Sequence, residues 1–120
     1  MSYKTRCKNN LRGLKRFRLF HGGLPRPYVK SLTKIALKNK LRKVSPLFLE
    51  LCECRLDTVL YRSKFAFSVR NARQLILHGK ILVNNKSIQT NSYVLSPGDI
   101  ITISFMNFNL IKSNIKRSIK

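Results

Sequence analysis

Between Ser68 and His78 the sequence places cationic and polar side chains at helical spacing, with no acid among them. Arg70 and Arg73 are three residues apart, so on a helix their guanidinium groups would be neighbours on one face, and Gln74 follows on the same side. A guanidinium group presents a planar fork of donors that engages two phosphate oxygens at once. The alternative is an ordinary solvated face of a basic helix. Because nearby acids are too few to pair with these cations, we expect a surface that binds RNA or DNA phosphates.

A short helix is required to position this surface. Ala72, Leu75 and Ile76 repeat at the interval of one helical face. Ser68 is a preferred N-cap residue, and Gly79 stands where a left-handed C-cap is expected. The pattern therefore predicts a helix that begins after Ser68, ends before Gly79, and turns its apolar face away from the arginines.

The neighbouring segments predict more helices and then a small antiparallel sheet. Ser45 followed by proline is typical of a helix start, and residues 55–65 carry a second helical pattern. Asp57 in the first turn of that helix suits the helix dipole and is expected to orient Arg55 or Arg62 rather than to act in catalysis. The strands and turns expected after the arginine-bearing helix are strands at 81–83, 93–95 and 100–105 and turns at 84–85 and 96–99.

The charge of the chain sets the class of partner. The formal net charge is +21, from 25 Lys and Arg against 4 Asp and Glu. Self-repulsion of this size opposes compaction and favours a polyanionic partner, which is nucleic acid, an anionic membrane or an acidic protein. No apolar run approaches the ~18 residues that would span a bilayer. The basic opening is not followed by the apolar block of a signal peptide, although its arginines and lack of acid resemble a mitochondrial presequence.

The distribution of charge divides the 120 residues into three parts. Residues 1–44 hold no acid, residues 45–105 hold all four acids, and residues 106–120 are again basic and acid-free. We therefore expect a basic arm, a compact domain and a basic tail with these bounds. The arm includes a lysine-rich amphipathic helix between Tyr28 and Val44, lying on phosphates or packed on the domain. An acid-free block usually orders on its partner, so residues 1–44 should be disordered in the isolated protein.

Cysteine and histidine residues do not stand at the spacing of a metal site. The three cysteines are an odd number, which fits a reducing compartment better than a secreted disulfide framework. Cys52 and Cys54 would point to different faces of a helix, and no second pair stands at zinc-finger spacing. Cys52 is expected in the core, and a zinc site drawing on Cys7 is the alternative. We expect no metal, no cofactor and no enzymatic activity.

The order of the motifs resembles a known RNA-binding family. From residue 55 onward the chain reads RLDTVLYRSKFAF, then ARQLILH, then ILVNNK, then SYVLSPGD. In order and spacing these blocks closely resemble the RNA-binding domain of small-subunit ribosomal protein S-four, over about residues 50–103. The family implies an alpha-L domain, in which two helices in an L shape pack on a small sheet and the helical face meets folded RNA. The expected fold class is therefore α+β: short helices on a small antiparallel sheet, with a basic N-terminal arm and C-terminal tail.

The resemblance and the charge pattern together give the expected RNA contacts. These are Arg55, Arg62, Lys64, Ser68, Arg70, Arg73, Gln74, His78, Lys80 and Lys86. Two positions depart from the family. Val69 stands where an arginine is common, and Arg70 follows one place later, which turns the charge by about 100° around the helix. Lys64 stands where the family usually has glycine. Replacing Arg73 by alanine is expected to weaken RNA binding and to flatten its salt dependence by about one unit.

The resemblance also implies a function and a place. It implies a structural constituent of the small ribosomal subunit that binds small-subunit ribosomal RNA, with neighbouring ribosomal proteins as partners, messenger RNA nearby where it enters the subunit, and no membrane. The alternative is a free-standing factor with the same domain, acting in ribosome quality control. RFRLFHGGLP resembles a Phe-Tyr-Gly-x-Leu-Pro stretch of mitochondrion-encoded members, and the richness in Lys, Asn, Ile and Leu suits an A+T-rich organellar genome. We expect a mitochondrial ribosome, with another organellar or bacterial-type ribosome as the alternative.

Overall fold

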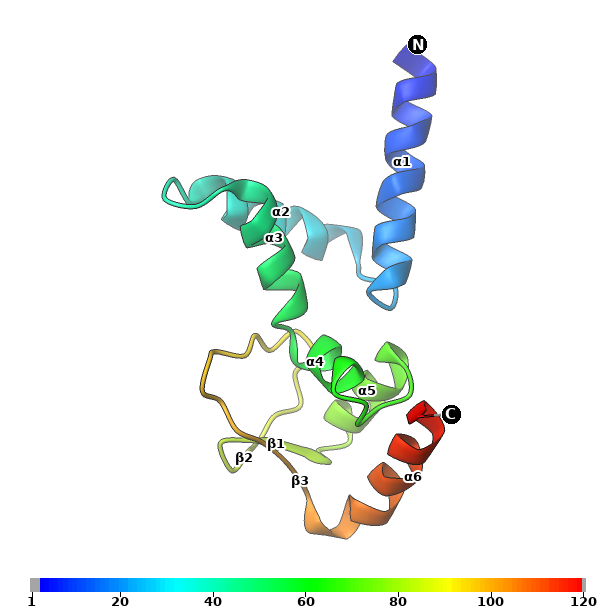
Figure 1. Cartoon of the computed structure of the whole chain (residues 1–120). Coiled ribbons are helices and arrows are strands. Elements are labelled where there is room, and N and C mark those ends of the chain that lie inside the picture. The colour runs from blue at the N-terminus through cyan, green and yellow to red at the C-terminus, as the bar shows by residue number, and fades with distance from the viewer. Residues whose placement is uncertain (1–2, 120) are drawn as a thin grey trace.

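The chain folds into helices at both ends and a three-stranded sheet between them. The computed structural model describes residues 3–119 (Figure 1). The elements, in chain order, are α1 (Tyr3–Phe20), α2 (Arg26–Lys38), α3 (Val44–Glu53), α4 (Leu56–Arg62), α5 (Val69–Leu77), β1 (Ile81–Val83), β2 (Lys86–Ser87), β3 (Ile101–Ile103), a 3-10 turn (Phe105–Asn107) and α6 (Phe108–Ile119).

The arm contains two helices where the sequence pattern predicted one. The predicted helix is α2, and its apolar stripe, made of Val29, Leu32 and Ala36, is buried as expected. Its expected end at Val44 is wrong, because α2 ends at Lys38 and a loop follows in which Leu41 is 96% exposed. The helix α1 was not predicted, and it extends away from the remaining elements (Figure 1). Whether residues 1–44 are disordered without a partner concerns the isolated protein and stays a prediction.

The core lies where α4 and α5 pack together over the sheet. Its fully or almost fully buried side chains are Leu56, Leu60, Ala66, Ala72, Leu75, Ile76, Ile81, Val83 and Ile111. The expected apolar face of α5 is therefore confirmed, since Ala72, Leu75 and Ile76 all belong to this cluster. Cys52 is also fully buried, as predicted.

The sheet has the strand order β2-β1-β3 with antiparallel pairing throughout. The turn predicted at residues 84–85 is confirmed, and Asn84 and Asn85 both adopt positive φ, at 50° and 64°. The strand predicted at residues 93–95 is wrong. Its backbone forms only an isolated bridge to Arg55, because Leu95 N–H donates to the carbonyl of Cys54 and the carbonyl of Tyr93 accepts from Leu56 N–H. This segment thus ties down the α3–α4 junction instead of widening the sheet.

The segment interpreted as a basic tail contains α6, and part of it joins the core. Ile111 is 1% exposed. The amide of Asn114 on α6 donates to the side-chain oxygen of Asn71 on α5 at 3.4 Å. The boundary between domain and tail at residue 105 stays a proposal, but α6 packs on the domain and does not simply extend from it.

The molecule is elongated because its N-terminal third projects from the core. The radius of gyration is 16.7 Å and the extents are 56 × 34 × 22 Å, whereas a compact chain of this length has a radius near ~14 Å. Within residues 3–119, none of the helices combines the length and apolar character needed to cross a bilayer. An elongated shape with an exposed basic arm leaves much of the surface available to a partner.

Candidate nucleic-acid interface

The exposed face of α5 forms a polar ridge. Arg70, Gln74 and His78 are spaced by four residues and are all exposed. They lie along about 12 Å of the helix axis. The predicted N-cap is confirmed, since the hydroxyl of Ser68 accepts a hydrogen bond from Asn71 N–H at 3.1 Å. The predicted C-terminal glycine is confirmed by Gly79, whose φ is 67°. The ridge offers one guanidinium, one amide and one imidazole to a ligand.

Two cations lie beside the ridge at the end of α4. Arg62 pairs with Glu53 at 3.1 Å, and its guanidinium carbon lies 5.7 Å from the centre of the Phe20 ring. Both side chains of this ion pair are largely exposed, so it contributes only about 0–1 kcal/mol and Arg62 could exchange Glu53 for a phosphate at small cost. Lys64 is exposed and adopts a φ of 68°, the left-handed conformation that explains why the resembling family has glycine there.

The remaining predicted lysines lie on the sheet side of the domain. Lys80 precedes β1 and is half-buried, whereas Lys86 is exposed on β2. Both follow the ridge in the sequence, one on each side of β1, and no hydrogen bond joins their side chains to the ridge in the described part of the chain. That these two lysines extend the positive surface of α5 stays a prediction.

Arg55 is buried and forms an internal ion pair. Its guanidinium donates to both carboxylate oxygens of Asp57, at 3.0 and 3.1 Å, and Asp57 is fully buried. The expectation that Asp57 orients Arg55 is confirmed, while Arg62 pairs with Glu53 instead. Arg55 also lies 4.4 Å from the ring centre of Tyr28 in the arm, which is a cation–π contact.

Arg73 connects the same carboxylate to the arm. Its Nε donates to Asp57 at 2.8 Å, and its two terminal nitrogens donate to the backbone carbonyls of Gly22 at 2.5 Å and of His21 at 2.8 Å. The expectation that acids were too few to pair with this arginine is wrong, because Asp57 reaches it from α4. Contact of Arg55 and Arg73 with RNA stays a prediction, but each bonds internally to Asp57, and for Arg73 the sequence pattern did not indicate this role.

Electrostatics keep the buried carboxylate ionised. Burial alone pushes the pKa of Asp57 up, but hydrogen bonds from Arg55 and Arg73, together with their positive charges, outweigh it and hold the pKa below its ordinary value. Burial likewise acts to lower the pKa of Arg55, and the bond to Asp57 reverses this and raises it. Two cations and one anion thus form a cluster that is fully charged at neutral pH, here called the Asp57 clamp (Arg55, Asp57, Arg73).

The sequence interpretation missed the exposed aromatic residues near the ridge. Phe20 ends α1 and is 67% exposed, Phe67 precedes the cap and is 48% exposed, and Tyr61 on α4 is 39% exposed. Aromatic side chains interleaved with arginines in RFRLF and in YRSKFAF were a signal that could have found them. Such rings are surfaces on which nucleobases stack.

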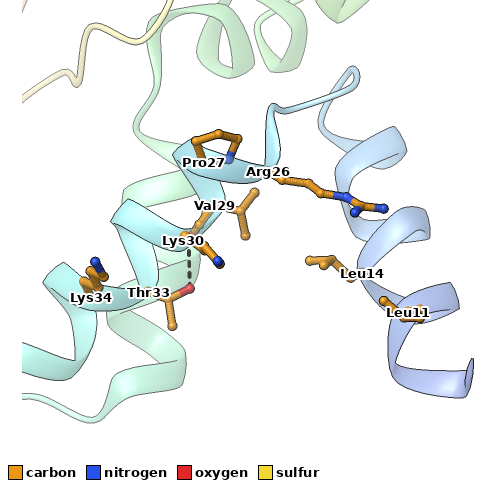
Figure 2. Close-up of a pocket in the computed structure, with 8 residues that line it drawn as sticks. All are labelled: Leu11, Leu14, Arg26, Pro27, Val29, Lys30, Thr33 and Lys34. Carbon is orange, nitrogen blue, oxygen red and sulfur yellow. Dashed lines mark hydrogen bonds between the residues drawn. The ribbon is translucent and has the colours of Figure 1, made fainter. Parts of the chain in front are cut away.

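A groove lies between α1 and α2. Figure 2 shows Leu14 on α1 facing α2, and Arg26 reaching from the start of α2 toward α1. The groove has a volume of about 790 Å³. Its lining residues are Leu11, Leu14, Arg26, Pro27, Val29, Lys30, Thr33 and Lys34. It is basic and aliphatic, and it has no aromatic ring.

Potential metal ligands do not gather in the described residues. No group of three or more His, Cys, Asp or Glu side chains that could hold a metal ion occurs there. The zinc hypothesis that used Cys7 falls outside the side chains that the structure describes. His21 is buried and packs on Phe17, with ring centres 4.7 Å apart, and burial lowers its pKa.

Comparison with known proteins identifies the domain. Residues 54–101 match the model of the S4 domain. The chain is 37% identical over 103 residues to the small ribosomal subunit protein uS4 of Aquifex aeolicus, covering 84% of this chain and 48% of that relative. It is 40% identical over 84 residues to uS4B of Bdellovibrio bacteriovorus, covering 70% and 40%. It is 46% identical over 71 residues to uS4 of Thermus thermophilus, covering 58% and 34%.

The matches cover only part of each relative. The chain spans less than half the length of these curated relatives. The matched domain covers α4, α5 and β1 and thus contains the ridge and the Asp57 clamp. The resemblance and the α+β fold class predicted from the motifs are confirmed. The chain therefore carries an S4 domain and is homologous to proteins named small ribosomal subunit protein uS4.

Proposed function

We propose that this protein is a structural constituent of the small ribosomal subunit that binds small-subunit ribosomal RNA and acts by binding, without catalysis. The observation that carries the proposal is the similarity to uS4 of Aquifex aeolicus across 84% of the chain, which extends well beyond the S4 domain at residues 54–101. The similarity is not confined to the S4 domain, which supports a ribosomal protein over a free-standing factor that shares the domain alone.

The exposed cations support binding to phosphates. Arg70, Arg62 and Lys64 are exposed around the start of α5, and the acid nearest to them, Glu53, is in a weak surface pair. Phosphate contacts would supply affinity, and the fit of a folded RNA junction to the α4–α5 face would supply selectivity. The net charge of +21 requires a counter-charge of the size that folded RNA provides.

The partners and the compartment belong to the same proposal. Neighbouring ribosomal proteins would contact the surfaces of α1 and α2 that RNA leaves free, and messenger RNA would pass nearby. The named relatives are bacterial, and the composition suits an A+T-rich organellar genome. We place the protein in a mitochondrial ribosome, with another organellar or bacterial-type ribosome as the alternative.

The test is binding to a structured small-subunit ribosomal RNA fragment, compared with an unstructured polynucleotide of equal length. We expect a preference for the fragment and a steep fall of affinity with salt. Because Arg73 has three internal partners, Arg70 is the better probe of phosphate contact. Arg70→Ala should reduce the preference and lower the salt slope by about one unit. Arg42→Ala, which removes an equal charge in the remote α2–α3 loop, should leave the preference intact.

Two outcomes decide the proposal. An equal affinity for the fragment and the unstructured polymer would contradict specific RNA binding. Loss of the protein from small subunits after a high-salt wash would favour the free-standing factor, because a structural constituent stays with the particle.

A further inference from the structure

We propose that a hollow between the arm and α5 holds an unpaired nucleobase of the bound RNA. The hollow, here called the ring pocket, has a volume of about 310 Å³. It is lined by Leu19, Phe20, Gly22, Tyr61, Phe67, Ser68, Val69 and Arg70. This inference rests on the proposed function and names a site within it.

The lining of the ring pocket matches the chemistry of a nucleobase. Phe20, Tyr61 and Phe67 come from three separate segments and all remain 39% or more exposed. Leaving three large rings partly in water is unfavourable, so a ligand that covers them gains apolar burial. Every base offers a flat π-face to such rings, so stacking is possible whatever the identity of the base.

The rim of the ring pocket matches the phosphate that accompanies a base. Arg70 lines the pocket and is exposed, and Arg62 lies over the Phe20 ring. No acid lines the pocket. A nucleotide whose base enters the hollow would place its phosphate within reach of a guanidinium group, which binds phosphate through two oxygens.

The larger groove between α1 and α2 lacks these features. Its walls include the aliphatic Leu11, Leu14 and Val29, and no aromatic ring lies among its lining residues (Figure 2). Phosphates would be attracted to its lysines, but a base would have no ring on which to stack. Of these two sites, the ring pocket is therefore the better one for binding a base.

The wall of the ring pocket that the arm supplies is held in place before RNA binds. Gly22 packs so closely on α5 that a Cβ atom there would lie 2.7 Å from Cγ1 of Val69. Arg73 donates hydrogen bonds to the carbonyls of His21 and Gly22. The backbone that directly follows Phe20 is therefore held against α5 by contacts that need no ligand, and a preorganised site avoids part of the entropic cost of binding.

Substitutions that remove a ring but keep an apolar side chain test the stacking. Phe20→Leu and Phe67→Leu are measured against the structured ribosomal RNA fragment at several salt concentrations, and Phe105→Leu is the control because Phe105 is 95% exposed and outside the pocket. Each pocket variant should weaken binding by about 5- to 150-fold, the loss of one base stack. The salt slope should not change, because no phosphate contact is lost. Circular dichroism should show unchanged folding, since both rings are largely exposed.

Any of three results would contradict base binding in the ring pocket and would leave the proposed function intact. These are an unchanged affinity for the fragment in both pocket variants, an equal loss in Phe105→Leu, or an equal loss against a fully paired duplex that has no base to insert. A photoreactive phenylalanine analogue in place of Phe67 in assembled subunits should crosslink to RNA, and a crosslink to protein alone would mean that a protein side chain fills the hollow. If the unaltered protein showed no preference for the fragment, the proposed function itself would fail.

Discussion

Replacing Asp57 by asparagine is the most direct test of how the arm is attached to the domain. The carboxylate of Asp57 is fully buried and accepts hydrogen bonds from Arg55, from Arg73 and from Thr58 N–H at 2.9 Å. Asparagine keeps the shape but removes the charge, and its amide nitrogen would face guanidinium donors. Two buried or half-buried cations would then lack a counter-ion.

The structure sets the size of the expected effect. Removing one partner of a buried ion pair costs about 3–5 kcal/mol, because the remaining charge stays desolvated. Small domains have stabilities near the lower end of about 5–15 kcal/mol. The free energy of unfolding should therefore fall by about half or more, and the thermal midpoint by more than about 10 °C.

Urea unfolding of the full chain, followed by circular dichroism, measures this loss. The matched control is Glu53→Gln, which makes the same acid-to-amide change in a surface pair with Arg62 and should cost at most about 1 kcal/mol. Chymotryptic cleavage after Phe20 should also accelerate in Asp57→Asn, because Arg73 would no longer hold His21 and Gly22 in the turn before α2. If the two variants lost equal stability, the reasoning from burial would be refuted.

The pH dependence of stability gives an independent check on the same carboxylate. The folded pKa of Asp57 is below its unfolded value of about 3.9, so its contribution is fully present above that value and is lost as pH falls through the lower folded pKa. The unaltered protein should therefore lose stability below about pH 4 more steeply than Asp57→Asn. Parallel pH profiles for the two proteins would contradict an ionised, clamped Asp57.

Four other substitutions test local features of the fold by urea unfolding. Gly22→Ala and Gly23→Ala both strain a residue with φ near +75°, and each should lower the free energy of unfolding by about 1–2 kcal/mol for that reason. Only the Cβ of Gly22→Ala also meets Val69, so this variant should lose at least about 1 kcal/mol more. Equal losses in the two variants would argue against the close contact. Ser68→Ala should lower the free energy of unfolding by about 1 kcal/mol, because the N-cap hydrogen bond is lost. An unchanged stability would show that the cap does not stabilise the helix. Lys64→Gly should stabilise the protein by about 0.5–1 kcal/mol by relieving its left-handed conformation, and a net loss would show that the lysine makes a stabilising contact.

Local features were predictable from sequence because they depend on neighbours within a few residues. Ser68, Gly79 and the apolar spacing of α5 determined its ends and buried face. The turn at Asn84 followed from the preference of asparagine for positive φ. The helix α6 was missed, although Ile111 and Ile115 are four residues apart and pack on the core.

Long-range contacts were not predictable in the same way. Arg73 bonds to a carbonyl 52 residues earlier in the chain, and helical spacing says only that its side chain leaves the apolar face. The neighbour that meets it depends on where the arm folds back, which Gly22 permits by its small size and positive φ. The predicted Arg70–Arg73 phosphate pair therefore separates in the structure into one exposed arginine and one internal arginine.

The use of the four acids explains how so basic a chain keeps a positive surface. Asp57 lies in the clamp, Asp99 accepts from Ser96 N–H in a turn, and Glu50 and Glu53 pair with arginines. Each ion pair found among the side chains that the structure describes uses arginine, whose planar fork binds a carboxylate with defined geometry, and none of these pairs uses lysine. Three of the acids thus pair with specific arginines, and no ion pair is found for Arg70 or for the lysines whose side chains the structure describes. A surface built in this way is neutralised only by an external anion, and for this reason the fold and the proposed RNA binding are parts of one electrostatic arrangement.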